Sequence, residues 1–175
     1  MAHERIRSGE LKIRISGLSN GIHEYHFSTE PAGISLDANF HQPVEIDVHL
    51  DKTTRQTYLR AAILSSGRFQ CDRCLDEFDQ KLFTEYSMFY VFDEVDAVKY
   101  PDDEVTILAP DQVFIDPTED VRQMVLLAVP LKLLCREECK GLCPHCGTNW
   151  NDATCDCERE TIDPRWQGLQ GLLDT

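Results

Sequence analysis

The spacing of the cysteines is the feature that most constrains this chain. Six of the eight cysteines fall between Cys135 and Cys157, and the other two form the close pair Cys71 and Cys74. The run Cys143-Pro-His-Cys146-Gly147 is typical of a metal knuckle, in which two thiolates share one tight turn and a glycine supplies the positive φ that follows. Because zinc takes about four such ligands in a tetrahedron, eight thiols predict one or two zinc ions.

The sequence leaves the pairing of these ligands open. One arrangement has two sites, made of Cys71, Cys74, Cys135 and Cys139 for one ion and of Cys143, Cys146, Cys155 and Cys157 for the other. The second arrangement has one site, formed by the four cysteines of residues 135–146, and leaves the remaining thiols unligated. Coordination by four thiolates has no open position for water, so both arrangements indicate a structural metal and not a catalytic one.

Disulfides are the main alternative use for so many cysteines. They would require an oxidising compartment, but residues 1–30 contain no apolar segment of a secretory signal. No stretch approaches the roughly 18 apolar residues of a membrane span. We therefore expect a cytoplasmic protein that makes no membrane contact, in which close cysteine pairs hold metal or carry redox chemistry.

The net charge of −14 is unevenly distributed along the chain. Between Asp76 and Asp120 there are 14 acidic residues and two basic ones. This charge opposes binding to a phosphate backbone, where affinity comes from Lys and Arg. The stretch 93–110 reads as an acidic loop with a short strand at 105–108, suited to a basic partner such as a ribosomal protein. Three basic residues beside the cysteines leave room for a local RNA contact: Lys132, Arg136 and Lys140.

The first half of the chain reads as antiparallel β structure. Apolar and polar residues alternate with the period of a half-buried strand in five segments, 11–15, 22–27, 44–50, 56–64 and 82–92.

One helix is predicted over residues 117–129. Asp116-Pro-Thr-Glu119 combines an N-cap, a proline at the first helical position and a glutamate placed for a capping box. Pro130 ends this helix. One apolar face is expected from four residues: Val121, Met124, Val125 and Ala128.

We therefore predict an α+β fold. Residues 1–130 form a mostly antiparallel β domain that includes the capped helix. Residues 131–175 form a cysteine-rich, zinc-binding tail, in which Asp163-Pro164 begins a short C-terminal helix.

These motifs in combination resemble the YceD family, whose members are called large ribosomal RNA subunit accumulation proteins. The resemblance runs from about Leu11 to Leu173 and rests on four blocks: Cys71-Asp-Arg-Cys74-Leu75, Leu127-Ala-Val-Pro130-Leu131, Cys139-Lys-Gly-Leu-Cys-Pro-His-Cys-Gly-Thr-Asn149 and Ile162-Asp-Pro-Arg165-Trp166. It implies a bacterial cytosolic factor that is needed for accumulation of the large-subunit ribosomal RNA. No established enzymatic activity comes with it.

The leading hypothesis is a non-enzymatic assembly factor, since the sequence contains no GxSxG, Walker A or GxGxxG motif and no recognisable acid–base pair. Its partners would be a large-subunit precursor or ribosomal proteins. The candidate partner-binding residues are Lys132, Arg136, Lys140 and Arg165. Two alternatives use the cysteines differently: a rubredoxin-like iron site for electron transfer, and thiol redox chemistry at Cys71 and Cys74.

Overall fold

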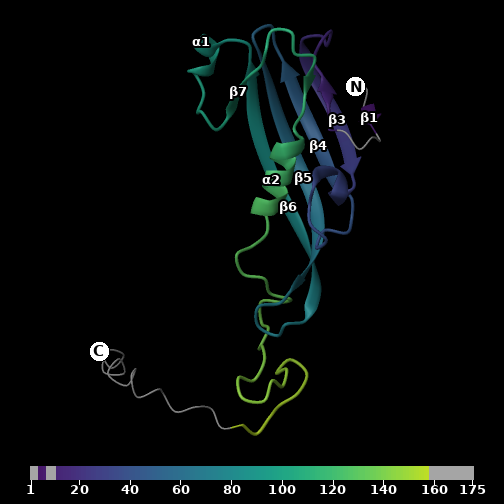
Figure 1. Ribbon diagram of the computed structural model, residues 1–175, viewed down its shortest axis with the longest axis vertical. Coiled ribbons are helices and arrows are strands. Elements are labelled where there is room, and N and C mark those ends of the chain that lie inside the picture. Colours follow the sequence, from purple (N-terminus) through teal and green to yellow (C-terminus); the bar gives the residue numbers. More distant parts are fainter. Residues whose placement is uncertain (1–3, 7–10, 158–175) are drawn as a thin grey trace, which may run out of the picture.

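A six-stranded sheet forms the body of the protein in the computed structural model, which describes residues 4–6 and 11–157 (Figure 1). Across the sheet the strands are β1 (Glu4–Ile6), β3 (Gly21–Thr29), β4 (Val44–Lys52), β5 (Gln56–Gln70), β6 (Glu77–Val91) and β7 (Val105–Ile107). Strands β3 to β6 pair antiparallel, whereas β1 and β7 join the two edges in parallel. The prediction of a mostly antiparallel β fold is confirmed, and the parallel edge strands were not anticipated.

The hairpin of β5 and β6 is longer than the sequence predicted. Each strand has 15 residues, and the ladder continues past the predicted ends at residues 64 and 82 to the pair Gln70–Glu77. The added part begins with Ser65-Ser66-Gly67, where the apolar alternation stops. These residues remain buried because the backbone at Gly67 bridges to Phe40 and the ring of Phe69 packs close to its Cα. The hairpin therefore extends well beyond the rest of the sheet (Figure 1).

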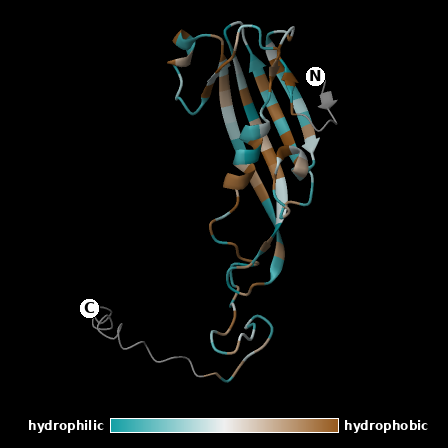
Figure 2. Ribbon diagram, in the orientation of Figure 1, coloured by the Kyte–Doolittle hydropathy of each residue, from teal (hydrophilic) through white to brown (hydrophobic). Residues whose placement is uncertain are grey.

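Alternation along the strands gives the sheet one buried face and one open face. In β4 the side chains of Val44, Ile46, Val48 and Leu50 are buried, and the residues between them are exposed or half-buried. The same alternation is visible as bands along the central strands in Figure 2. The buried face is covered by helix α2 (Thr118–Leu127) and by the 3₁₀ helix η1 (Pro31–Ile34).

Helix α2 is slightly shorter than the predicted 117–129. Its first carbonyl is that of Pro117, which accepts from the N–H of Val121 at 2.9 Å. The Asp116 carboxylate accepts the Thr118 N–H at 3.1 Å, but Glu119 bonds to Arg122 and Gln123, so the predicted capping box is wrong. The shift at each end is of the size expected where helix ends fray.

The predicted apolar face of α2 is confirmed. Val121 and Val125 are fully buried, and Met124 and Ala128 pack against the same core.

Two short segments differ from the predictions. The predicted strand 11–15 is reduced to β2 (Ile13–Arg14), which pairs with β8 (Phe114–Ile115) outside the main sheet. Its alternation is nevertheless real, since Leu11, Ile13 and Ile15 are buried. Within 93–110, β7 matches the expected short strand, and one helical turn, α1 (Glu94–Ala97), was missed. Asp93 caps that turn by accepting the Asp96 N–H at 2.7 Å.

The predicted division after residue 130 stays a prediction, as does the tail as a separate unit. The expected C-terminal helix from Asp163, together with Arg165, lies outside the described residues. No helix within the described ranges is long and apolar enough to cross a membrane.

The burial of α2 gives a direct test of this packing. Val125→Ala removes two methyl groups from a fully buried site, so the free energy of unfolding should fall by about 2 kcal/mol. Leu127→Ala is the matched control, because the Leu127 side chain is 75% exposed; its effect should stay within about 0.5 kcal/mol. Urea unfolding measures both, and equal effects would contradict the placement of the helix.

Candidate metal centre

The eight cysteine sulfurs lie in two groups of four. We name these the hairpin group (Cys71, Cys74, Cys135, Cys139) and the tail group (Cys143, Cys146, Cys155, Cys157); within each group the Sγ atoms all lie within 4.8 Å of one another. This grouping matches the two-site arrangement left open by the sequence, and it separates the four cysteines of residues 135–146. Each group could hold one metal ion, while the presence and identity of the ions remain predictions.

The hairpin group begins at the turn between β5 and β6. The N–H of Leu75 donates to the Cys71 carbonyl at 2.9 Å, and the N–H of Cys71 donates to the Asp76 carbonyl, also at 2.9 Å. Leu75 has a φ of 62°, in the left-handed region that favours glycine. This tight turn brings the Cys71 and Cys74 side chains to the same side, at the end of the long hairpin.

The tail group begins at a turn with the same hydrogen bonds. The N–H of Gly147 donates to the Cys143 carbonyl at 2.9 Å, and the N–H of Cys143 donates to the Thr148 carbonyl at 2.8 Å. Gly147 has a φ of 73°, as the knuckle pattern predicts. The chain therefore contains two knuckles of one geometry, although only the second has the glycine that identifies such a turn in a sequence.

The segment 133–142 docks on the hairpin turn through backbone contacts. Asp72 and Leu133 exchange two hydrogen bonds, at 2.8 and 2.7 Å. The Arg73 guanidinium donates to the Cys139 carbonyl at 2.7 Å, and the Arg73 carbonyl accepts from Leu142. Gly141, at a φ of 78°, passes so close that a Cβ there would lie 2.9 Å from the Arg73 carbonyl oxygen. These contacts place Cys135 and Cys139 beside Cys71 and Cys74.

Two asparagines connect the groups, and sequence reasoning missed them. The Asn151 amide donates to the Cys139 sulfur at 3.3 Å and accepts the Lys140 N–H at 2.9 Å. The Asn149 amide donates to the Asp76 carboxylate at 2.9 Å. The repeated asparagine in Asn149-Trp150-Asn151, lying between two cysteine pairs, was the available signal. Such amide–sulfur bonds stabilise thiolate ligands and fix their orientation.

The crowding of thiols within each group favours a bound cation. The hydrogen bond from Thr148 lowers the pKa of Cys146 to about 6, whereas the hydrogen bond to Cys146 raises the pKa of Cys157 to about 12. In the hairpin group, the amide of Asn151 leads the contacts that lower the pKa of Cys139, while burial raises that of Cys135. Four thiolates at this spacing repel one another, and a divalent cation would remove that repulsion.

The two groups differ in exposure. Cys71, Cys74 and Cys139 are buried in a small cluster that also includes Phe78 and Leu142. In the tail group, Cys146 and Cys157 are exposed. The Trp150 indole N–H donates to the Cys155 sulfur at 3.3 Å.

The predicted partner-binding residues lie on the surface of the same region. Lys132, Arg136 and Lys140 are exposed and alternate in sequence with ligands of the hairpin group. Within the described residues none of the three forms an ion pair. His145, inside the tail knuckle, is exposed and is not among the grouped ligands.

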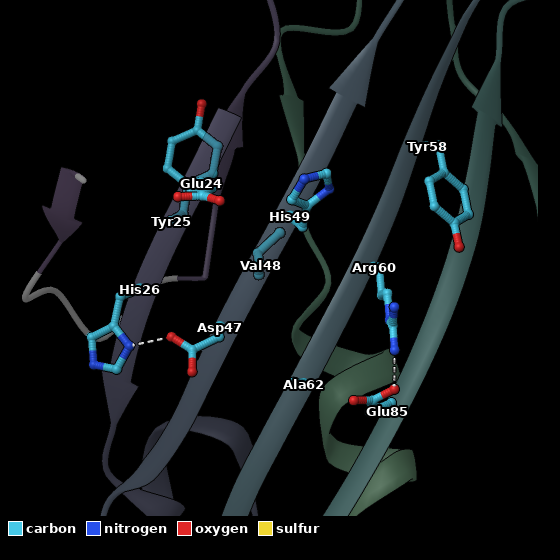
Figure 3. A pocket seen from close by; sticks show the side chains of 10 residues that line it. All are labelled: Glu24, Tyr25, His26, Asp47, Val48, His49, Tyr58, Arg60, Ala62 and Glu85. Atoms are coloured by element: carbon cyan, nitrogen blue, oxygen red, sulfur yellow. Dashed lines mark hydrogen bonds and ion pairs between the residues drawn. The ribbon is translucent and has the colours of Figure 1, made fainter. Parts of the chain in front are cut away.

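A separate hollow of about 560 Å³ lies on the open face of the sheet (Figure 3). Its side chains come from β3 to β6 and are mostly charged or aromatic. His26 contacts Asp47 at 2.7 Å and Glu45 at 3.1 Å. Across the hollow, Arg60 pairs with Glu85 at 2.6 Å. Within each pair the opposite charges compensate one another, and neither pair places a nucleophile next to a base.

The two knuckles predict opposite effects of glycine. Leu75→Gly should raise the free energy of unfolding by about 0.5 kcal/mol. The change removes left-handed backbone strain of about 1–2 kcal/mol, while glycine adds about 0.5–1 kcal/mol of conformational entropy lost on folding. Gly147→Ala should lower the free energy of unfolding by about 1 kcal/mol through conformation alone, since a Cβ there meets nothing within 4 Å. Thermal denaturation of the metal-loaded variants measures both. Destabilisation by Leu75→Gly would contradict the matched geometry.

Comparisons with known proteins agree with the resemblance noted in the sequence. The family model described as "Large ribosomal RNA subunit accumulation protein YceD" matches residues 65–173. A chloroplastic YCED homolog 1 of Arabidopsis thaliana, named as a large ribosomal RNA subunit accumulation protein, is 23% identical over 157 residues. That alignment covers 75% of this chain and 49% of the relative, so the chain spans about half the length of that protein.

Bacterial relatives match a similar share of the chain. The uncharacterised protein YlbN of Bacillus subtilis is 26% identical over 132 residues, covering 75% of this chain and 74% of the relative. An uncharacterised protein of Mycobacterium tuberculosis is 27% identical over 139 residues, with coverage of 74% and 62%. No solved structure matches, and the alternatives of electron transfer and thiol redox chemistry gain no support from these names.

The family match includes the end of β5, the whole of β6, the two knuckles and the segments between them. Residues 65–173 are more than half of the chain, and this chain therefore belongs to the YceD family.

Proposed function

We propose that this protein is a non-enzymatic ribosome biogenesis factor that supports accumulation of the large-subunit ribosomal RNA. Membership of the YceD family is the observation that carries this proposal. The protein would act by binding a large-subunit precursor particle or a ribosomal protein. The described residues support a binding role, because the cysteine groups are closed four-ligand sets and the hollow on the sheet holds mutually paired charges.

Zinc is the metal we propose for both cysteine groups, with all eight cysteines as ligands. Four thiolates complete a tetrahedral shell and leave no position for substrate, so the ions would stabilise structure. In the hairpin group the ion would fix the docking of segment 133–142 on the turn. In the tail group it would close the loop between Cys143 and Cys157.

The acidic surface around α1 is the proposed contact for a basic ribosomal protein. Glu94, Asp102 and Asp103 are exposed, and their carboxylates make no hydrogen bond or ion pair within the described chain. This surface lies at the end of the sheet away from the cysteine groups (Figure 1). A lysine- or arginine-rich partner would be attracted there by charge complementarity.

Lys132, Arg136 and Lys140 are the proposed second contact, to RNA phosphates. They are exposed and lie close to ligands of the hairpin group in the sequence. Their lack of acidic partners within the described residues leaves their charges available. Arg165 is proposed with them from the sequence alone.

The metal proposal predicts about two zinc ions per chain. The double variant Cys74→Ser, Cys139→Ser should bind only the tail-group ion, and Cys146→Ser, Cys157→Ser only the hairpin-group ion. Metal analysis of the purified proteins by mass spectrometry measures the stoichiometry. Iron in place of zinc would contradict the choice of metal.

A third variant separates the two ligand arrangements. Cys71→Ser with Cys74→Ser should lose one ion of two if the groups bind separately. If one ion were instead shared by the cysteines of 135–146, this variant would bind as much metal as the wild type.

The function predicts a specific defect on depletion. Removal of the protein from its host should lower the ratio of large-subunit to small-subunit ribosomal RNA, and the tagged protein should sediment with large-subunit precursors. Quantification of both RNAs and gradient sedimentation measure these effects. An unchanged ratio together with protein left at the top of the gradient would contradict the proposal.

Complementation with surface variants then tests the two contacts. The triple variant Glu94→Gln, Asp102→Asn, Asp103→Asn should weaken association with the particle if the acidic contact matters. An equal change of charge at other exposed acids, Glu137→Gln, Glu138→Gln and Asp152→Asn, is the matched control.

The basic contact has a different signature. Neutralising Lys132, Arg136 and Lys140 to glutamine should weaken association and flatten its dependence on salt, since fewer counterions are released. Binding that survives either set unchanged would eliminate the corresponding contact without affecting the depletion test.

A further inference from the structure

The outer edge of β6 is open along most of its length. Strand β7 pairs only with residues 89–91 of β6. From Asp79 to Ser87, the described chain makes no backbone–backbone hydrogen bond to β6 except those from β5. Such an edge is a template for another strand, and proteins usually shield it.

The backbone direction of each residue at this edge follows from the contacts with β7. Phe89 donates its N–H to the Glu104 carbonyl, and the Val91 carbonyl accepts from Leu108. Because N–H and C=O of one residue point to the same side of a strand, the odd-numbered residues of β6 face the edge. From Asp79 to Ser87 these are Asp79, Lys81, Phe83, Glu85 and Ser87.

The side chains of these residues are self-complementary. If a second β6 pairs antiparallel about Phe83, residue i lies opposite residue 166 − i. Lys81 then lies opposite Glu85 twice, on either side of a Phe83–Phe83 pair. All are odd-numbered residues, so the backbone groups that face the edge meet their counterparts in a regular antiparallel ladder. We propose that the β6 edge is a self-association surface, whose partner is the β6 edge of a second copy of this chain.

The neighbouring registers give less favourable cross-strand side-chain pairs. A shift of two residues in one direction places Phe83 opposite Glu85. A shift in the other direction places Phe83 opposite Lys81 and brings Asp79 opposite Glu85, two like charges. Only the register centred on Phe83 joins the apolar pair and both opposite-charge pairs, which are the cross-strand contacts that stabilise sheets.

The exposure of this edge also fits a protein contact. The Phe83 side chain is 65% exposed, and Leu64, its neighbour across the ladder on β5, is 48% exposed. Pairing of two copies would bring Phe83 and Leu64 of one copy next to Phe83 and Leu64 of the other. Such exposure on a strand edge is otherwise a liability.

The charges are available for this pairing. The Lys81 ammonium has no ion pair within the described chain. Glu85 bonds to Arg60 through one oxygen at 2.6 Å, as Figure 3 shows, and can accept Lys81 of the second copy with the other. The Lys81 carbonyl already accepts from the Gln80 amide at 2.9 Å, and its second lone pair remains for the ladder.

Charge variants of the full-length protein test the surface by sedimentation. Wild-type protein should dimerise in the micromolar range, as expected for a small interface. Lys81→Glu alone and Glu85→Lys alone should each weaken the dimer by at least about tenfold, because both cross-strand pairs become repulsive. The double variant Lys81→Glu, Glu85→Lys should dimerise again.

Mixing the two single variants is the sharpest control. One variant then presents only acids and the other only lysines, so a heterodimer should form from two proteins that are each monomeric. Unchanged circular dichroism of each variant excludes misfolding. The proposal is overturned by a monomeric wild type, which would leave the edge to a strand from another protein, by a dimer insensitive to both variants, or by variants that fail to combine. None of these results depends on the proposed ribosomal role.

Discussion

The docking of segment 133–142 on the turn between β5 and β6 is the interaction on which the cysteine end of the molecule depends. Asp72 and Arg73 bind the backbone of Leu133, Cys139 and Leu142, so residues distant in sequence form one four-thiol group. The backbone contacts position the sulfurs, and a cation would then remove their mutual repulsion. The tail group is attached to this frame by Asn149 and Asn151.

The sheet supplies the other constraint, because only one of its faces is covered. Helix α2 packs on β5 and β6, and residues of α2 and η1 share one core with Val44, Ile46 and Leu50 of the buried face. The open face keeps paired charges such as Arg60–Glu85, and two of its exposed apolar residues, Leu64 and Phe83, lie near the β6 edge. The acidic turn α1 and the cysteine groups occupy opposite ends of this sheet (Figure 1). A large partner could therefore contact both ends at once.

The sequence predicted those parts of the fold that follow from local pattern. Period-two alternation located the central strands, and helical spacing identified Val121 and Val125 as core residues. Local pattern failed to predict the structure where tertiary contacts determine it. Ser65 and Ser66 continue β5 because Gly67 bridges to Phe40, and residues 11–15 contribute only a two-residue strand to a separate sheet. The knuckle at Cys143 was recognisable by its glycine. The equivalent turn at Cys71 was not, since Leu75 takes the same conformation without one. The grouping of the eight sulfurs depends on the docking contacts of segment 133–142, and the spacing of the cysteines does not predict those contacts.

The position of the two cysteine groups follows from the shortage of apolar surface at this end of the protein. The main core ends near Phe69 and Leu82. Beyond it, the described residues form a small cluster in which Cys71, Cys74 and Cys139 are buried, and Phe78, Leu134 and Leu142 pack partly buried against them. Such a cluster contributes too little hydrophobic free energy to order a further segment of chain. Metal coordination by thiolates can supply the missing stabilisation, as it does in small domains that fold only with their ion. The buried hairpin group would then have the larger effect on the fold, because the tail group depends on the frame that the hairpin group holds.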